Sequence, residues 1–226
     1  KNTIKVIYVS LAILMGGGLV FFGIGGDVSG GLVDAITERQ GGGDTGEERF
    51  ESREREAAAR TRANPQDAPA WAALARARFS RAGIGENFDP SKNTYTDAGK
   101  AKLRGAAQAW EKYLELDPPN EQASQVASIM VQAYSPDGLD EPDKAVRAQE
   151  IIAEARPGPN TYAQLAVAAY GAGQSRKGDL AKAEALERAD KDEREALRGQ
   201  LEQAAAQAAQ GAGGAGEAPT GSATGE

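Results

Sequence analysis

The chain has 226 residues, of which 33 are Asp or Glu and 26 are Lys or Arg, so its formal net charge is −7. It contains neither cysteine nor histidine, which excludes thiolate and imidazole chemistry, disulfide bonds and Cys/His metal sites. The acidic residues fall mostly at exposed helical spacings, so a pair of converging catalytic carboxylates is not indicated. We therefore expect a protein that is not an enzyme and that needs no cofactor.

A long uncharged segment occupies residues 6–26 and consists mostly of Val, Ile, Leu, Met, Phe, Ala and Gly. As a helix it would span roughly 32 Å at ~1.5 Å per residue, close to the ~30 Å hydrocarbon core of a bilayer. Lys1 and Lys5 precede it and Asp27 follows it, so the positive-inside rule places the N-terminus in the cytoplasm. We expect residues 1–26 to form a single-pass anchor in the plasma (inner) membrane, with the rest of the chain extracytoplasmic.

A cleaved signal peptide is the main alternative for this segment, because it would share the basic start and the apolar middle. The uncharged run is longer than the usual apolar region of about 7 to 15 residues, and no A-x-A cleavage site follows it. The uncleaved membrane anchor is therefore the favoured interpretation, and a buried soluble helix is a second alternative.

Two polar segments follow the predicted anchor. Residues 27–46 place a short apolar stretch between glycine clusters, which is typical of a flexible juxtamembrane tether. Residues 47–62 contain strong helix formers and Glu/Arg pairs four residues apart, such as Glu56 with Arg60. This pattern predicts a charged, solvated helix with Phe50 as its one large apolar residue.

A repeated pattern of apolar residues extends over residues 63–190. Two segments that follow proline turns place an aromatic residue, a leucine and an alanine on one helical face: Trp71, Leu74 and Ala75, then Tyr162, Leu165 and Ala166. Two helices between them share the offsets 0, +4, +7 and +12, which end in a proline: Ala106, Trp110, Tyr113 and Pro118 in the first, Ala145, Gln149, Ile152 and Pro157 in the second. Matched offsets that end in a proline indicate an internal repeat.

These residues resemble the tetratricopeptide repeat (TPR) family, whose 34-residue helix–turn–helix unit reads W-x2-L-G-x2-Y, then A-x3-F, a small residue and a terminal proline. The segment from Trp71 to Ala75 matches the first helix of the unit, and Ala106, Trp110 and Pro118 match the second. The chain departs from the motif where Arg78 occupies the tyrosine position, and about 19 additional residues separate these two helices. A hairpin array of another type is the alternative.

The resemblance implies a fold in which about three helical hairpins stack over residues 63–190. Each hairpin buries only one face by itself, so neighbouring hairpins complete a continuous core. Residues 191–210 carry leucine and alanine at helical spacing, which predicts a C-terminal capping helix. Residues 211–226 lack large apolar side chains, which predicts a disordered tail. The expected fold class is all-α: an N-terminal transmembrane helix followed by a small TPR-like helical-hairpin solenoid.

The insertion at residues 83–97 alternates oxygen-bearing side chains in a way that superficially resembles a calcium loop. Lys92 stands where such a loop needs glycine, and Ala98 stands where it needs a bidentate glutamate, so we expect no metal. We expect a polar loop that Phe88 and Tyr95 pin to the repeats, or that closes over one end of a binding groove. An enzyme would require Asp89 or Asp97 to face a second buried carboxylate.

Positive charge gathers in residues 57–104, which hold nine Lys or Arg and only four Asp or Glu. Such a basic patch would face an acidic partner or lipid head groups, and its alternative is an ordinary solvated helix face. The acidic total and the lack of an interleaved aromatic and basic stripe exclude nucleic acid as the partner. The candidate residues of this patch are Arg60, Arg62, Arg76, Arg78, Arg81, Lys100, Lys102 and Arg104.

The TPR resemblance implies a binding function without covalent chemistry, in which a concave helical surface binds a peptide or protein partner. Bacterial proteins with an N-terminal anchor and extracytoplasmic repeats resemble ancillary or chaperone-like factors near the protein-translocation machinery. The alternative is a structural scaffold subunit of a larger bacterial envelope or membrane complex. A scaffold would depend on its own anchor, whereas a client-binding domain would work on any tether.

Overall fold

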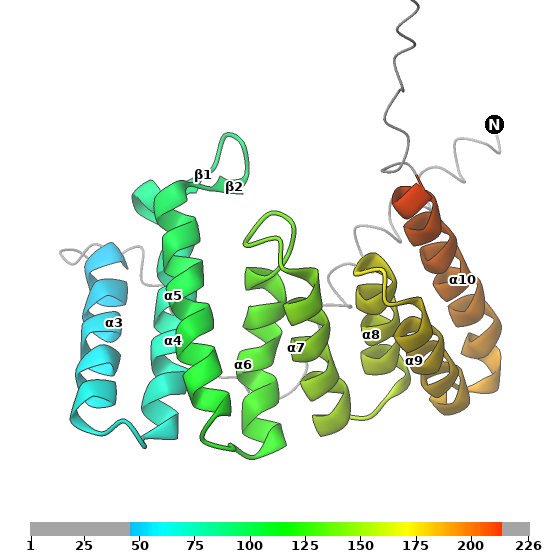
Figure 1. The fold of residues 1–226 in the computed structure, drawn as a ribbon, viewed down its shortest axis with the longest axis horizontal. Coiled ribbons are helices and arrows are strands. Elements are labelled where there is room, and N and C mark those ends of the chain that lie inside the picture. The colour runs from blue at the N-terminus through cyan, green and yellow to red at the C-terminus, as the bar shows by residue number, and fades with distance from the viewer. Residues whose placement is uncertain (1–45, 214–226) are drawn as a thin grey trace, which may run out of the picture. The chain divides into compact units, whose positions relative to one another are not determined.

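The computed structural model of the chain describes residues 46–213, in which helices α3 to α10 run alternately up and down, side by side in chain order (Figure 1). The prediction of an all-α protein is confirmed for these residues, with a short two-stranded ribbon as the exception. The helices are α3 (Gly46–Ala63), α4 (Ala68–Ala82), α5 (Asp97–Leu114), α6 (Asn120–Ala133), α7 (Pro142–Ala155), α8 (Pro159–Gly171), α9 (Ser175–Arg188) and α10 (Lys191–Gly213).

The predicted anchor at residues 1–26 lies outside the described residues, as do the predicted tether up to residue 45 and the predicted tail from residue 214 onward. Within residues 46–213, no helix is long and apolar enough to cross a membrane. The charged helix predicted at residues 47–62 corresponds to α3. The helix predicted at residues 191–210 corresponds to α10, which extends to Gly213.

Consecutive helices pack as pairs: α4 with α5, α6 with α7, and α8 with α9. Helix α7 also packs on α8, and α10 packs on both α8 and α9, so it covers the end of the series. The three pairs are formed by the segments in which the three hairpins were predicted, the first of them with the insertion between its helices.

Helices α4 and α5 begin where the sequence supplies side-chain caps. The Asp67 side chain accepts a hydrogen bond from the Ala70 backbone N–H at 2.9 Å, and Pro69 follows in the first turn of α4. The Thr96 hydroxyl accepts one from the Gly99 N–H at 3.2 Å at the start of α5. Proline-containing turns separate the pairs, because proline does not continue a helix and restricts the residue before it. These turns contain Pro65, Pro118, Pro119 and Pro157.

The core is built largely from alanine, with a few large side chains, and it forms two clusters. One cluster joins α3 to α7 and contains Leu103, Trp110, Met130 and Tyr134. The other joins α7 to α10 and contains Leu201. Most of the repeat-signature residues lie in these clusters: Leu74, Ala75, Ala106, Trp110, Ile152, Leu165 and Ala166 are buried, Trp71, Pro118, Ala145 and Tyr162 are half-buried, and Pro157 is exposed.

A close approach of α8 and α9 depends on Gly178. A Cβ atom at this position would overlap the ring of Tyr170, so only a residue without a side chain fits there. The Tyr170 hydroxyl donates a hydrogen bond to the Asp179 carboxylate at 2.8 Å. Burial, together with this carboxylate, raises the pKa of Tyr170 to about 12.

The insertion between α4 and α5 contains a 3-10 turn, Gly85–Asn87, and two short strands, β1 (Phe88–Asp89) and β2 (Thr94–Tyr95). The strands pair antiparallel with Phe88 opposite Tyr95, and the two rings meet edge to face with their centroids 5.4 Å apart. Tyr95 also packs against the larger core cluster, whereas the ring contact of Phe88 is with Tyr95, so Tyr95 is the residue that joins the insertion to the core.

Candidate protein-binding surface

Each first helix of a pair keeps one exposed strip of side chains. We name these strips together the first-helix face, and its residues are Arg76 on α4, Gln125 and Gln132 on α6, and Gln164 and Val167 on α8. The Arg76 guanidinium donates a hydrogen bond to the Gln125 side-chain oxygen at 3.3 Å, which joins the strips of α4 and α6. The face therefore presents amides, one cation and one apolar side chain, since Val167 is 49% exposed.

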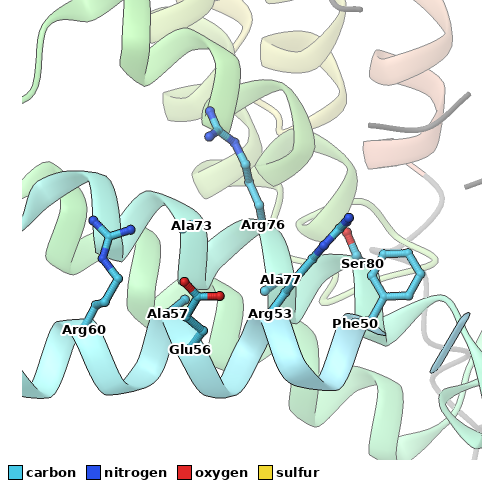
Figure 2. A pocket seen from close by; sticks show the side chains of 9 residues that line it. All are labelled: Phe50, Arg53, Glu56, Ala57, Arg60, Ala73, Arg76, Ala77 and Ser80. Atoms are coloured by element: carbon cyan, nitrogen blue, oxygen red, sulfur yellow. The ribbon is translucent and has the colours of Figure 1, made fainter. Parts of the chain in front are cut away.

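A groove of about 300 Å³ lies between α3 and α4, next to the first-helix face. Figure 2 shows Arg60, Glu56, Arg53 and Phe50 in a row along α3 and Arg76 and Ser80 on the neighbouring helix. We name this the α3–α4 groove; its lining residues are Phe50, Arg53, Glu56, Ala57, Arg60, Ala73, Arg76, Ala77 and Ser80. Arg76 belongs both to this groove and to the first-helix face.

The arginines of the α3–α4 groove keep most of their hydrogen-bonding capacity. The Arg53 guanidinium lies 5.8 Å from the centroid of the Phe50 ring, and Arg76 contacts the amide of Gln125. Arg60 pairs with Asp67 at 3.0 Å, not with Glu56 as the four-residue spacing had predicted. Because a guanidinium carries five N–H donors, a single ring or amide contact leaves several donors for a ligand.

A second group of cations surrounds Glu54 on the inward side of α3. Its carboxylate, with a side chain only 14% exposed, pairs with Arg78 at 3.2 Å, Arg81 at 2.7 Å and Lys102 at 3.1 Å. Burial alone would raise the pKa of Glu54, but hydrogen bonds from Arg81, Lys102 and Arg78 outweigh it and hold that pKa below its ordinary value. Glu54 thus connects α3 to both α4 and α5.

The structure divides the predicted basic patch into groups with different surroundings. Three members point toward Glu54, and Arg78 also donates to the Gly105 carbonyl oxygen at 2.9 Å, so they hold helices together rather than face solvent. Arg60 and Arg76 line the α3–α4 groove. The remaining members lie elsewhere: Arg62 beside a groove between α3 and α5, Lys100 half-buried, and Arg104 exposed.

Sequence reasoning missed Arg53 and Glu54 as members of these groups. A signal for the groove was present, because Phe50, Arg53, Ala57 and Arg60 follow one another at helical spacings and share a face of α3. No local signal identified Glu54, since its partners lie 24, 27 and 48 residues further along the chain.

The opposite side of the stack, formed by the second helices, is held together by ion pairs. Lys144 on α7 pairs with Glu111 on α5 at 3.2 Å, and its ammonium lies 5.7 Å from the centroid of the Tyr134 ring. Lys177 on α9 pairs with Glu150 on α7 at 2.6 Å. Lys144 and Lys177 are thus engaged by carboxylates of neighbouring helices, which makes them less suited than the arginines of the α3–α4 groove to a charged ligand.

The acidic residues of the insertion are engaged locally. The Asp89 carboxylate accepts hydrogen bonds from the Ser91 N–H at 3.0 Å and the Ser91 hydroxyl at 2.6 Å, and it pairs with Lys92 at 3.4 Å. Asp97 is exposed at the first turn of α5. In the part of the chain that the structure describes, no group of three or more acidic side chains is placed to hold a metal ion.

Comparison of the chain with protein-family models, with curated proteins and with solved structures finds no significant match.

Proposed function

We propose that this protein binds a peptide or protein partner through its first-helix face and the adjoining α3–α4 groove. The observation that carries the proposal is the contrast between the two sides of the stack. Arg53 and Arg76 contact a ring and an amide, whereas Lys144 and Lys177 on the second helices pair with carboxylates of neighbouring helices. Uncommitted donors beside small apolar side chains favour recognition of another chain.

The paired helices support assignment of the repeats to the TPR type. The residues that resemble the TPR signature lie mainly in the core, and the helix that follows the third pair covers its end, as an array of stacked hairpins requires. We further propose that residues 1–26 anchor the chain in the inner membrane and that the helices act outside it. The uncharged run of residues 6–26 and the two preceding lysines support this placement.

Within this proposal the protein acts by non-covalent binding, as an ancillary or chaperone-like factor that holds segments of other proteins near the translocation machinery. The absence of histidine and cysteine and the local engagement of Asp89 favour binding over catalysis. A scaffold role in an envelope complex would use the same surface for one fixed partner.

Photo-crosslinking from the full chain in intact membranes tests the proposal. A photoreactive benzoylphenylalanine replaces Gln125 or Gln164 on the first-helix face, and in a matched control it replaces Leu180, an exposed residue on the second helix α9. We expect discrete adducts from the two first-helix positions and few from Leu180. Adducts from Leu180 alone, or equal adducts from all three positions, would contradict the proposed binding face.

A further inference from the structure

We infer that the α3–α4 groove binds an acidic segment of a partner protein, in which carboxylates flank a small apolar side chain. The inference rests on the proposed function and names the chemistry of the partner. It follows from the charge of the groove, from the size of its floor and from the way in which α3 is held in place.

The groove is positively charged although the whole chain is acidic. Arg53, Arg60 and Arg76 contribute three positive charges to the lining and Glu56 contributes one negative charge. Asp67 engages part of Arg60, while Arg53 and Arg76 contact uncharged groups. Arginine binds carboxylates through parallel N–H donors, so this arrangement favours an acidic ligand.

The floor of the groove limits the apolar part of the ligand. Ala57, Ala73 and Ala77 form the floor, and the Phe50 ring closes one end. A volume of about 300 Å³ lies at the lower end of the range for ligand pockets, so it accepts one or two small side chains rather than a folded domain. A peptide segment with alanine- or valine-sized side chains between its acidic residues fits this description.

The groove has a fixed shape because ion pairs hold α3 in place against α4 and α5. Glu54 lies on the inward side of α3 and binds cations of α4 and α5, while Arg53, its neighbour in sequence, lines the groove. The Glu54 contacts therefore fix the helix that carries one wall of the groove. An anionic bilayer is a less favourable occupant, because the groove is concave with an alanine floor that takes a side chain, and a layer of lipid head groups offers none to fill it.

Fluorescence anisotropy with the full chain in a neutral detergent tests the inference. The probe is a fluorescein-labelled peptide of Glu-Ala-Ala-Glu repeats, and the comparison peptide carries Lys in place of Glu. The double variant R53E/R76E changes the charge of the groove lining from +2 to −2, and the matched control R104E reverses an exposed arginine outside the groove. A second variant, Ala73→Trp, fills the groove and leaves its charges intact.

We expect the acidic peptide to bind and the basic peptide not to bind, and we expect the Kd to rise at least tenfold in R53E/R76E and in Ala73→Trp. R104E should change the Kd less than twofold, and added salt should weaken binding of the unmodified chain. Circular dichroism of each variant confirms that its helices are retained.

Three results would overturn the inference: equal binding of the two peptides, an effect of R104E as large as that of R53E/R76E, or undiminished binding by Ala73→Trp. Preferential binding of phosphatidylglycerol vesicles by the unmodified chain over R53E/R76E, without peptide binding, would identify a lipid surface and also overturn it. If the crosslinks from Gln125 and Gln164 form but the acidic peptide does not bind, the proposed function stands and this inference fails. If neither result is obtained, both fail.

Discussion

Glu54 connects three cations from two other helices, so the stability of α3 depends strongly on one carboxylate. Its side chain is 14% exposed, and those of Arg81, Arg78 and Lys102 are 17%, 26% and 30% exposed. Partly buried cations that lose their shared anion repel one another, and Arg81 and Lys102 then lose the charged acceptor of their hydrogen bonds. This residue therefore has a larger effect on folding than any surface ion pair of α3.

We predict that Glu54→Gln lowers the free energy of unfolding of the full chain by about 2 kcal/mol. Urea unfolding followed by tryptophan fluorescence measures the change, since Trp71 and Trp110 lie on α4 and α5. The matched control Glu56→Gln, on the solvent side of the same helix, should stay within about 0.5 kcal/mol of the parent chain. If Glu54→Gln lowers the free energy of unfolding no more than Glu56→Gln does, the ion pairs of Glu54 do not stabilise the fold.

The low pKa of the same carboxylate predicts that acid lowers the free energy of unfolding. The pKa of Glu54 is lower in the folded chain than its ordinary value of 4.5, so its contribution is fully present above pH 4.5 and is lost as the pH falls through the folded pKa. The free energy of unfolding should therefore fall more steeply below pH 4.5 in the parent chain than in Glu54→Gln. Parallel pH profiles would contradict this assignment.

At the scale of the helices, the close approach of α8 and α9 depends on a missing side chain. Gly178 lies in the interior of α9, where alanine is normally the better helix former, but a Cβ there would overlap the Tyr170 ring. Gly199 lies in the interior of α10, where a Cβ would meet no atom within 4 Å among the described residues. The two glycines therefore give a matched pair with opposite expected outcomes.

We predict that Gly178→Ala destabilises the full chain by about 2 kcal/mol, because the Tyr170 ring and its hydrogen bond to Asp179 must shift. Gly199→Ala should stabilise it by about 0.5 to 1 kcal/mol, because alanine reduces the entropy of the unfolded chain and favours the helix. Thermal unfolding followed by circular dichroism compares the two variants. A stabilising Gly178→Ala would show that the helices are not in the close contact described.

At the scale of the whole molecule, the residues that predicted the fold are those whose spacing is local. Trp71 and Leu74 in α4, and Leu165 and Ala166 in α8, repeat with helical periodicity, so the helices were predictable. The proline turns between the pairs, such as the one at Pro118, were equally local.

The candidate site was predictable only in part, since its residues come together from distant parts of the chain. Arg78, Arg81 and Lys102 read as one basic patch in sequence, but the fold brings Glu54 to them from another helix. Arg60 had Glu56 at helical spacing, yet it pairs with Asp67 in the turn that follows α3. Side-chain pairing depends on how the helices pack, and local spacing does not contain that information.

Hydroxyl-radical footprinting of the full chain shows whether the first-helix face is the surface that binds the partner. Val167 on α8 and Leu180 on α9 are the exposed large apolar residues of the described region, at 49% and 63% exposure, and they lie on a first and a second helix. Oxidation of each residue reports the solvent exposure of its own helix, so Val167 is the probe and Leu180 is the control within one sample. Oxidation of both is compared between the purified chain and the chain in its native membranes.

We expect oxidation of Val167 to fall at least threefold in native membranes and oxidation of Leu180 to stay unchanged. If Leu180 is protected and Val167 is not, or if neither residue is oxidised less in membranes than in the purified chain, the first-helix face is not the binding surface.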